Sequence, residues 1–167
     1  ASLPLSLSQL RTGDFEGTLH CAGPLHRPEE YDDYVAAFPE TPPITYVFYY
    51  TLVASRRTPA ENQAAIAAHL DTYSGIPFLG MSYTSTNLDG TSTGHDDEVA
   101  AGLFDDDIRG VARVMAEDGR PFFFRPGFEF NGAWNNYTPE TYVLAFQRIH
   151  DLFEEEGADQ AILWAST

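Results

Sequence analysis

A carboxylate, an arginine and a tryptophan stand close together in the stretch from Pro121 to Tyr137, PFFFRPGFEFNGAWNNY. Glu129 has a phenylalanine on each side, and Trp134 follows shortly after it. Aromatic neighbours would partly desolvate the carboxyl group and favour its protonated form, which a general acid needs. Arg125 opposes that effect, because a nearby cation favours the carboxylate. These residue types predict proton donation by Glu129, and an ordinary ion pair between Glu129 and Arg125 is the alternative.

The apolar run before Arg125 predicts a strand that positions these groups. Residues 121–124 are apolar without alternation, which is typical of a parallel strand that is buried on both faces. The strand is expected to end at Arg125, where a proline and a glycine indicate a turn. Parallel α/β folds keep their ligand sites just past the carboxyl ends of their strands. We therefore expect Glu129 to lie at such a site.

The segment RPGFEFNGAWNNY, with the helix expected after it and the later ILWAS, resembles the fourth and fifth strand regions of family 26 glycoside hydrolases. This mannanase-rich family belongs to the clan of retaining (β/α)8-barrel glycosidases. The resemblance implies that Glu129 is the general acid/base and that Trp134 stacks on a sugar. Arg125 and Asn131 match the motif as well, and the resemblance implies that they bind substrate or shape its loop. The family usually has a histidine before the acid/base, where this chain has Phe128.

The resemblance implies a function and its partners. The expected activity is endo-acting, retaining hydrolysis of a β-linked polysaccharide, with β-mannan first and β-1,3-xylan or mixed-linkage β-glucan next. A retaining mechanism needs a second carboxyl group as nucleophile, which the resemblance places on a seventh strand. No metal or organic cofactor is implied. The expected partners are a polysaccharide or oligosaccharide and either a carboxyl-terminal half of the barrel or a second copy. The alternative is a carbohydrate-binding module or an inactive barrel.

Strand and helix patterns alternate along the rest of the chain. We expect an extended lead-in over residues 1–13 and a long polar loop over residues 84–98. Strands are expected at 15–20, 44–50, 76–83, 121–124 and 161–165, and helices at 28–38, 58–73, 105–117 and 138–157. This alternation predicts one α/β domain over residues 1–167, a parallel (β/α) barrel of the TIM type with about five of its eight βα units present.

Two further residues and one loop are candidates for binding. His20 ends the first expected strand and Tyr83 the third, so both are expected to face the substrate, although local hydrogen bonding and packing are the alternatives. The acidic loop around His95, Asp96 and Asp97 suggests a metal site. The loop lacks the ligand order and the central glycine of an EF-hand, so we predict a solvated acidic loop and no metal.

The charge of the chain excludes some classes of partner. There are 25 acidic residues against nine basic ones, all of them arginine, and the net charge is −16. This balance argues against nucleic acid and anionic membranes as partners.

Cys21 is the only cysteine, so no internal disulfide is possible. The chain begins ASLPLSLSQL without a basic region, which favours a mature secreted protein.

Overall fold

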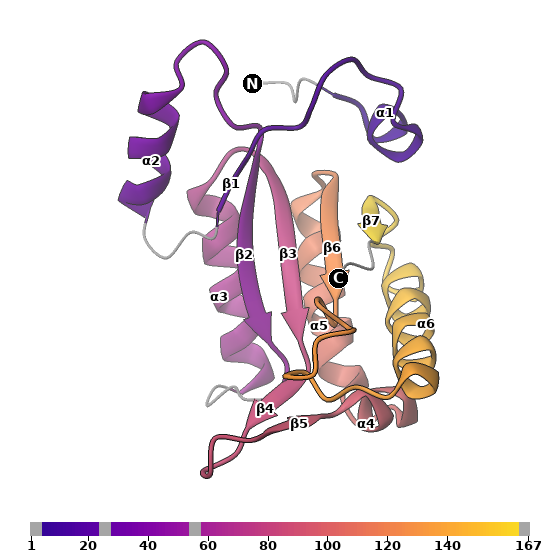
Figure 1. Ribbon diagram of the computed structural model, residues 1–167. Coiled ribbons are helices and arrows are strands. Elements are labelled where there is room, and N and C mark those ends of the chain that lie inside the picture. The colour runs from indigo at the N-terminus through magenta and orange to yellow at the C-terminus, as the bar shows by residue number, and fades with distance from the viewer. Residues whose placement is uncertain (1–4, 24–27, 54–57, 164–167) are drawn as a thin grey trace.

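The computed structural model of the chain describes residues 5–23, 28–53 and 58–163. They form a mixed α/β fold (Figure 1). The elements are α1 (Leu7–Thr12), β1 (Cys21–Ala22), α2 (Pro28–Ala37), β2 (Thr45–Thr51), α3 (Pro59–Thr72), β3 (Ile76–Ser82), β4 (Thr84–Thr86), β5 (Ser92–Gly94), α4 (Asp96–Ala101), α5 (Asp105–Asp118), β6 (Phe122–Pro126), α6 (Pro139–Glu155) and β7 (Ala161–Leu163).

Five of the strands form one parallel sheet in the order β1-β2-β3-β6-β7, which is also their order along the chain. β4 and β5 form a separate antiparallel hairpin. All the parallel strands therefore point toward the same edge of the sheet, which we call the carboxyl edge. In Figure 1 the arrowheads of β2, β3 and β6 point toward the end of the molecule where the hairpin and α4 lie, and α1 lies at the opposite end.

The helices are distributed unequally over the two faces of the sheet. Buried side chains of α3, α5 and α6 form one cluster with alternate residues of the strands, and Tyr31 of α2 packs against it. We call this side the covered face. The other face, which we call the open face, is contacted by Leu10 of α1, which packs with Ile76 and Phe123. When parallel strands follow one another in chain order and every crossover connection has the same hand, all the crossover helices lie on one face of the sheet.

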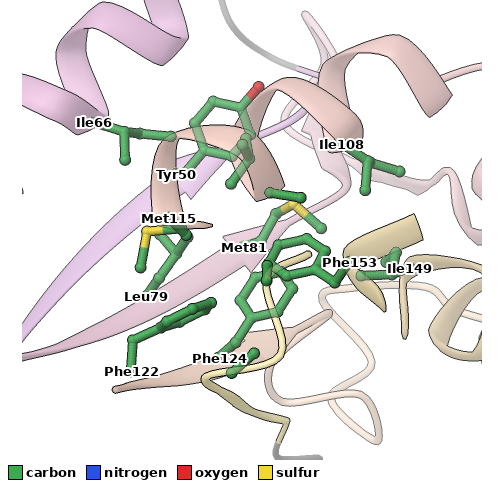
Figure 2. Close-up of a cluster of buried hydrophobic side chains, with 14 of the residues drawn as sticks. Tyr50, Ile66, Leu79, Met81, Ile108, Met115, Phe122, Phe124, Ile149 and Phe153 are labelled. Carbon is green, nitrogen blue, oxygen red and sulfur yellow. The ribbon is translucent and has the colours of Figure 1, made fainter. Parts of the chain in front are cut away.

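The covered face carries the main core (Figure 2). Phe124 and Phe153 stack with their ring centroids 4.5 Å apart, which joins β6 to α6. Leu79 and Met81 of β3 are fully buried beside them. From α5, four apolar residues on one side of the helix are all buried: Ile108, Val111, Ala112 and Met115.

The amino-terminal segment differs from the prediction. Residues 1–4 lie outside the described part of the chain, and the expected extended lead-in is wrong for residues 7–12, which form α1. Ser6 starts this helix through a capping box, in which its Oγ accepts from the Gln9 backbone and the Gln9 side chain accepts from the Ser6 backbone. The spacing Ser-x-x-Gln was present in the sequence as a signal for this helix.

The first strand is shorter and later than expected. The predicted strand over residues 15–20 is wrong, because β1 comprises only Cys21–Ala22. Gly13 and Gly17 adopt φ angles of 69° and 92°. Positive φ angles turn the chain away from the extended conformation, so a strand cannot run through this segment.

The expected loop over residues 84–98 is largely regular. It contains β4, β5 and the first residues of α4, and Gly90 has a φ angle of 83° in the connection between the two strands. The remaining predicted elements are confirmed with small changes at their ends. Of the last predicted strand, residues 161–163 form β7 and residues 164 and 165 lie outside the described residues. Within the described ranges, no helix combines the length and apolarity that crossing a membrane requires.

Candidate active site at the carboxyl edge of the sheet

Glu129 lies in the turn that follows β6, as the sequence predicts. The Gly127 backbone N–H donates to the Met81 carbonyl at 2.8 Å, which holds this turn against the end of β3. Gly127 has a φ angle of 58°, and a Cβ atom at this position would collide with the hydroxyl of Tyr83. The glycine of the RPG segment therefore lets the chain turn immediately after the strand.

Glu129 itself adopts a left-handed backbone conformation, with a φ angle of 56°. This region is rarely populated by residues other than glycine, and it persists where surrounding contacts enforce it. Asn135 supplies those contacts, because its Nδ2 donates to the carbonyls of Phe128 and Glu129, each at 2.9 Å. The Gly132 backbone N–H also donates to the Glu129 carbonyl at 2.8 Å. The turn is thus fixed from two sides.

The Glu129 carboxylate is bonded to Trp134. The indole Nε1–H donates to Glu129 Oε2 at 2.9 Å, while 62% of Trp134 remains exposed. The structure gives no ion pair between Arg125 and Glu129, both of which lie in its described part, so the ion-pair alternative is wrong. The acid and the exposed aromatic ring therefore form a unit that faces solvent.

Arg125 lies on the open face of β6 between two aromatic rings. Its Cζ atom is 5.8 Å from the ring centroid of Phe78 and 5.4 Å from that of Phe128. These distances suit cation–π attraction. The Arg125 Nε is buried and has no hydrogen-bond partner among the described residues. The two rings therefore hold the guanidinium on the open face.

A tyrosine of β2 extends this polar and aromatic surface. Tyr49, Gly80 and Arg125 pair in one row across β2, β3 and β6. A Cβ atom at Gly80 would come within 2.7 Å of the Tyr49 ring, so the absence of a side chain lets that ring lie on the sheet. The Tyr49 and Phe128 ring centroids are 5.1 Å apart, and Tyr49 is 48% exposed. Tyr49 lies near the end of the strand expected at 44–50, where a tyrosine could stack on or hydrogen-bond a sugar or could simply pack.

Two asparagines of the turn have different surroundings. Asn131 is exposed, which leaves its side chain accessible to a ligand. Asn135 is 5% exposed and shapes the turn. Asn135 was not among the predicted site residues, although an asparagine close to a predicted turn is a general signal for hydrogen bonds from its side chain to the backbone.

The predicted position of His20 is wrong. His20 precedes β1, and its carbonyl accepts from the backbone of Ile44 and Thr45 at the amino end of β2. β2 has seven residues, so at about 3.3 Å per residue His20 lies roughly 20 Å from the carboxyl edge. Its imidazole is bonded to the Thr41 carbonyl at 2.7 Å and the Tyr34 hydroxyl at 3.0 Å. His20 therefore joins α2 and its following loop to the sheet, far from Glu129.

Tyr83 lies at the predicted edge but cannot contact a substrate, because its side chain is fully buried. Its ring packs against Tyr137 and Tyr142, with centroids 4.6 and 6.4 Å away. Burial raises the pKa of Tyr83, and the neighbouring Tyr142 and Tyr137 raise it further. The prediction that Tyr83 binds substrate is therefore wrong, and its role is to support the turn beneath Glu129.

The acidic loop is less solvated than expected. Asp96 is 3% exposed, and its Oδ2 accepts from the Thr138 backbone N–H at 3.0 Å and from the Thr141 hydroxyl. Asp96 thus caps the amino end of α6 from a distant part of the chain, and Thr138 makes no side-chain cap of its own. No group of three or more potential metal ligands occurs among the described side chains.

Among the residues that the structure describes, Glu129 is the only carboxylate within three positions after the end of a strand of the five-stranded sheet. The chain matches no family model and no curated protein.

Proposed function

We propose that this chain is part of a retaining glycoside hydrolase related to family 26, in which Glu129 is the general acid/base. The observation that carries the proposal is the Glu129–Trp134 pair at the carboxyl edge of a parallel sheet. A carboxyl group beside an exposed indole combines a proton donor with a flat apolar surface on which a sugar ring can stack. Tyr49 and Arg125 extend the same surface along the open face.

The arrangement of the sheet supports a barrel of the TIM type. Its parallel strands follow one another in chain order, and the helices α2, α3, α5 and α6 pack on one face. A doubly wound sheet would reverse its strand order and carry helices on both faces. The open face would become the interior of the barrel. Three further strands, from a carboxyl-terminal half or from a second copy, would close it.

The chemistry requires a second carboxyl group. In a retaining mechanism the two carboxyl groups are about 5 to 5.5 Å apart, and one of them attacks the anomeric carbon. Glu129 would protonate the departing sugar oxygen and later accept a proton from water. The nucleophile would come from a closing strand, because the other four strands of this sheet end without a carboxylate.

The surface charge favours a neutral polysaccharide as substrate. At a net charge of −16 the protein repels polyanions, whereas an uncharged β-mannan, β-1,3-xylan or β-glucan is not repelled. Such polymers are too large to enter a cell, so the proposed location is extracellular.

A carbohydrate-binding protein without hydrolytic activity is the second candidate. It is favoured by the lone carboxylate at the strand ends, since an exposed Trp134 and Tyr49 suffice for binding. Binding without shortening of the glycan would identify this case.

The test is hydrolysis of β-mannan by the whole gene product, compared between wild type and Glu129→Gln. The amide keeps the shape of the side chain and cannot donate the proton, so turnover should fall about 10²- to 10⁴-fold while binding persists. Glu140→Gln, an exposed position at the start of α6, is the matched control and should retain activity. A Glu129→Gln protein with more than about a tenth of wild-type turnover would exclude Glu129 as general acid.

A further inference from the structure

The β4–β5 hairpin and the start of α4 carry a second polar cluster, which the proposed glycosidase chemistry does not use. Ser85 Oγ lies 2.8 Å from His95 Nε2, and His95 Nδ1 lies 2.7 Å from Glu98 Oε2. Ser85 and His95 are half-buried, so water only partly competes for these bonds. The Glu98 side chain is 41% exposed.

Glu98 determines the direction of both hydrogen bonds. A carboxylate only accepts, so His95 must carry its hydrogen on Nδ1 and donate it to Glu98. His95 Nε2 is then an acceptor, and the Ser85 hydroxyl donates to it. A hydroxyl bonded to a base that is oriented by a carboxylate is the arrangement that activates a serine nucleophile.

The hairpin places this cluster on a polar surface. Ser85 pairs with Thr93 across the ladder, and Asn87 and His95 each lie two residues further along their segments, so the four share one face. The Asn87 amide donates to the Thr93 hydroxyl at 3.0 Å. The adjacent Thr84 projects from the opposite face, where it bonds to the turn after β6.

We propose that Ser85, His95 and Glu98 form an ester-hydrolysing site that is separate from Glu129. The substrate class is an ester of a short acyl group with a polar alcohol, such as an acylated sugar hydroxyl. The neighbours of Ser85 on this hairpin face, Asn87 and Thr93, suit a polar alcohol and offer no apolar surface for a long acyl chain.

The reaction follows from these three roles. Ser85 Oγ forms a bond to the ester carbonyl carbon, and its proton passes to His95 Nε2. The bond from that carbon to the alcohol oxygen then breaks, and His95 returns the proton to the alcohol. Water next attacks the acyl–serine and gives a proton to His95, and Ser85 recovers that proton when the carboxylic acid departs. Glu98 acts as a positioning residue, because it stabilises the imidazolium and fixes its tautomer.

The first experiment treats the wild-type chain with a fluorophosphonate and locates the labelled residue by peptide mass spectrometry. Labelling is expected at Ser85. Ser92, on the opposite face of the same hairpin, is the internal control and should remain unlabelled. Absence of label at Ser85 would overturn the proposal, and this readout needs no variant to fold.

The second experiment measures hydrolysis of p-nitrophenyl acetate and p-nitrophenyl octanoate. Wild type should prefer the acetate, and Ser85→Ala and His95→Gln should lose about 100-fold or more of the rate above background. Ser92→Ala, on the opposite face of the hairpin, should retain it. A wild-type rate equal to that of Ser85→Ala would overturn the proposal.

Discussion

The two faces of the five-stranded sheet carry different kinds of residue, and different elements of the chain cover them. On the covered face, large apolar side chains such as Phe122 and Phe124 meet four helices and are excluded from water. On the open face, Tyr49, Gly80 and Arg125 form a row, and the short helix α1 packs Leu10 against Ile76 and Phe123. The comparison indicates that the covered face provides the stability of this chain, whereas the open face is available to ligands or closing strands.

The comparison can be tested most strongly by removing one aromatic ring from each face. Phe124→Ala should lower the free energy of unfolding by about 3–5 kcal/mol, because it leaves a cavity in the core. Phe78→Ala on the open face should cost less than about 2 kcal/mol, because the ring is only half-buried. Denaturant unfolding of both variants measures the difference. Equal costs would show that the open face is packed as tightly as the covered one.

The second prediction concerns Asp96, which follows the hairpin and caps the start of α6 on the covered face. Asp96→Ala should lower the free energy of unfolding by about 2–3 kcal/mol, since two donors at the start of α6 lose their acceptor. The exposed Asp71→Ala is the matched control and should stay within about 0.5 kcal/mol of wild type. If both variants unfold like the wild type, the buried carboxylate does not stabilise α6.

Trp134 tests whether the open side of the molecule binds glycan. Trp134→Ala should weaken oligosaccharide binding by about 1–2 kcal/mol through lost contact with a sugar face. Trp134→Phe keeps an aromatic plate but removes the Nε1–H that donates to Glu129, so it should retain most of the affinity. Calorimetric titration measures both. Unchanged affinity in Trp134→Ala, with a lowered unfolding midpoint, would make Trp134 a structural residue instead.

The smallest expected effect is a pH dependence that arises on the covered face. Burial lowers the pKa of His69, which packs against Phe48 with ring centroids 4.4 Å apart. As the pH falls through about 6.5, the unfolded chain binds a proton that the folded chain resists, so stability decreases toward acid. His69→Leu should reduce the loss of stability between about pH 7.5 and about pH 5.5. The same loss in both proteins would contradict this contribution.

Local signals in the sequence were sufficient for most of the regular elements. Thr58 and Glu61 form a capping box at the start of α3, with Pro59 at the first helical position, and this spacing is visible in the sequence. The continuous apolar run 121–124 predicted a buried strand, and β6 is that strand. These signals act between residues a few positions apart, so they do not depend on the rest of the fold.

The site was only partly predictable, because a sequence motif does not show which side chains face the solvent. Glu129 and Trp134 meet as expected, since both belong to one short turn. Tyr83 was expected at the surface, yet the packing of Tyr137 and Tyr142 buries it. Its burial depends on residues about sixty positions away, which no local pattern contains.

The sequence by itself determined the alternation of strands and helices and the turn that carries Glu129, because period, capping and turn chemistry are local. Only the tertiary structure decided that His20 lies at the amino edge of the sheet, that Asp96 caps a distant helix, and that Ser85 meets His95. These contacts depend on strand register and on the path of the chain between elements. Register is a property of paired strands, and it exists only once the strands are together.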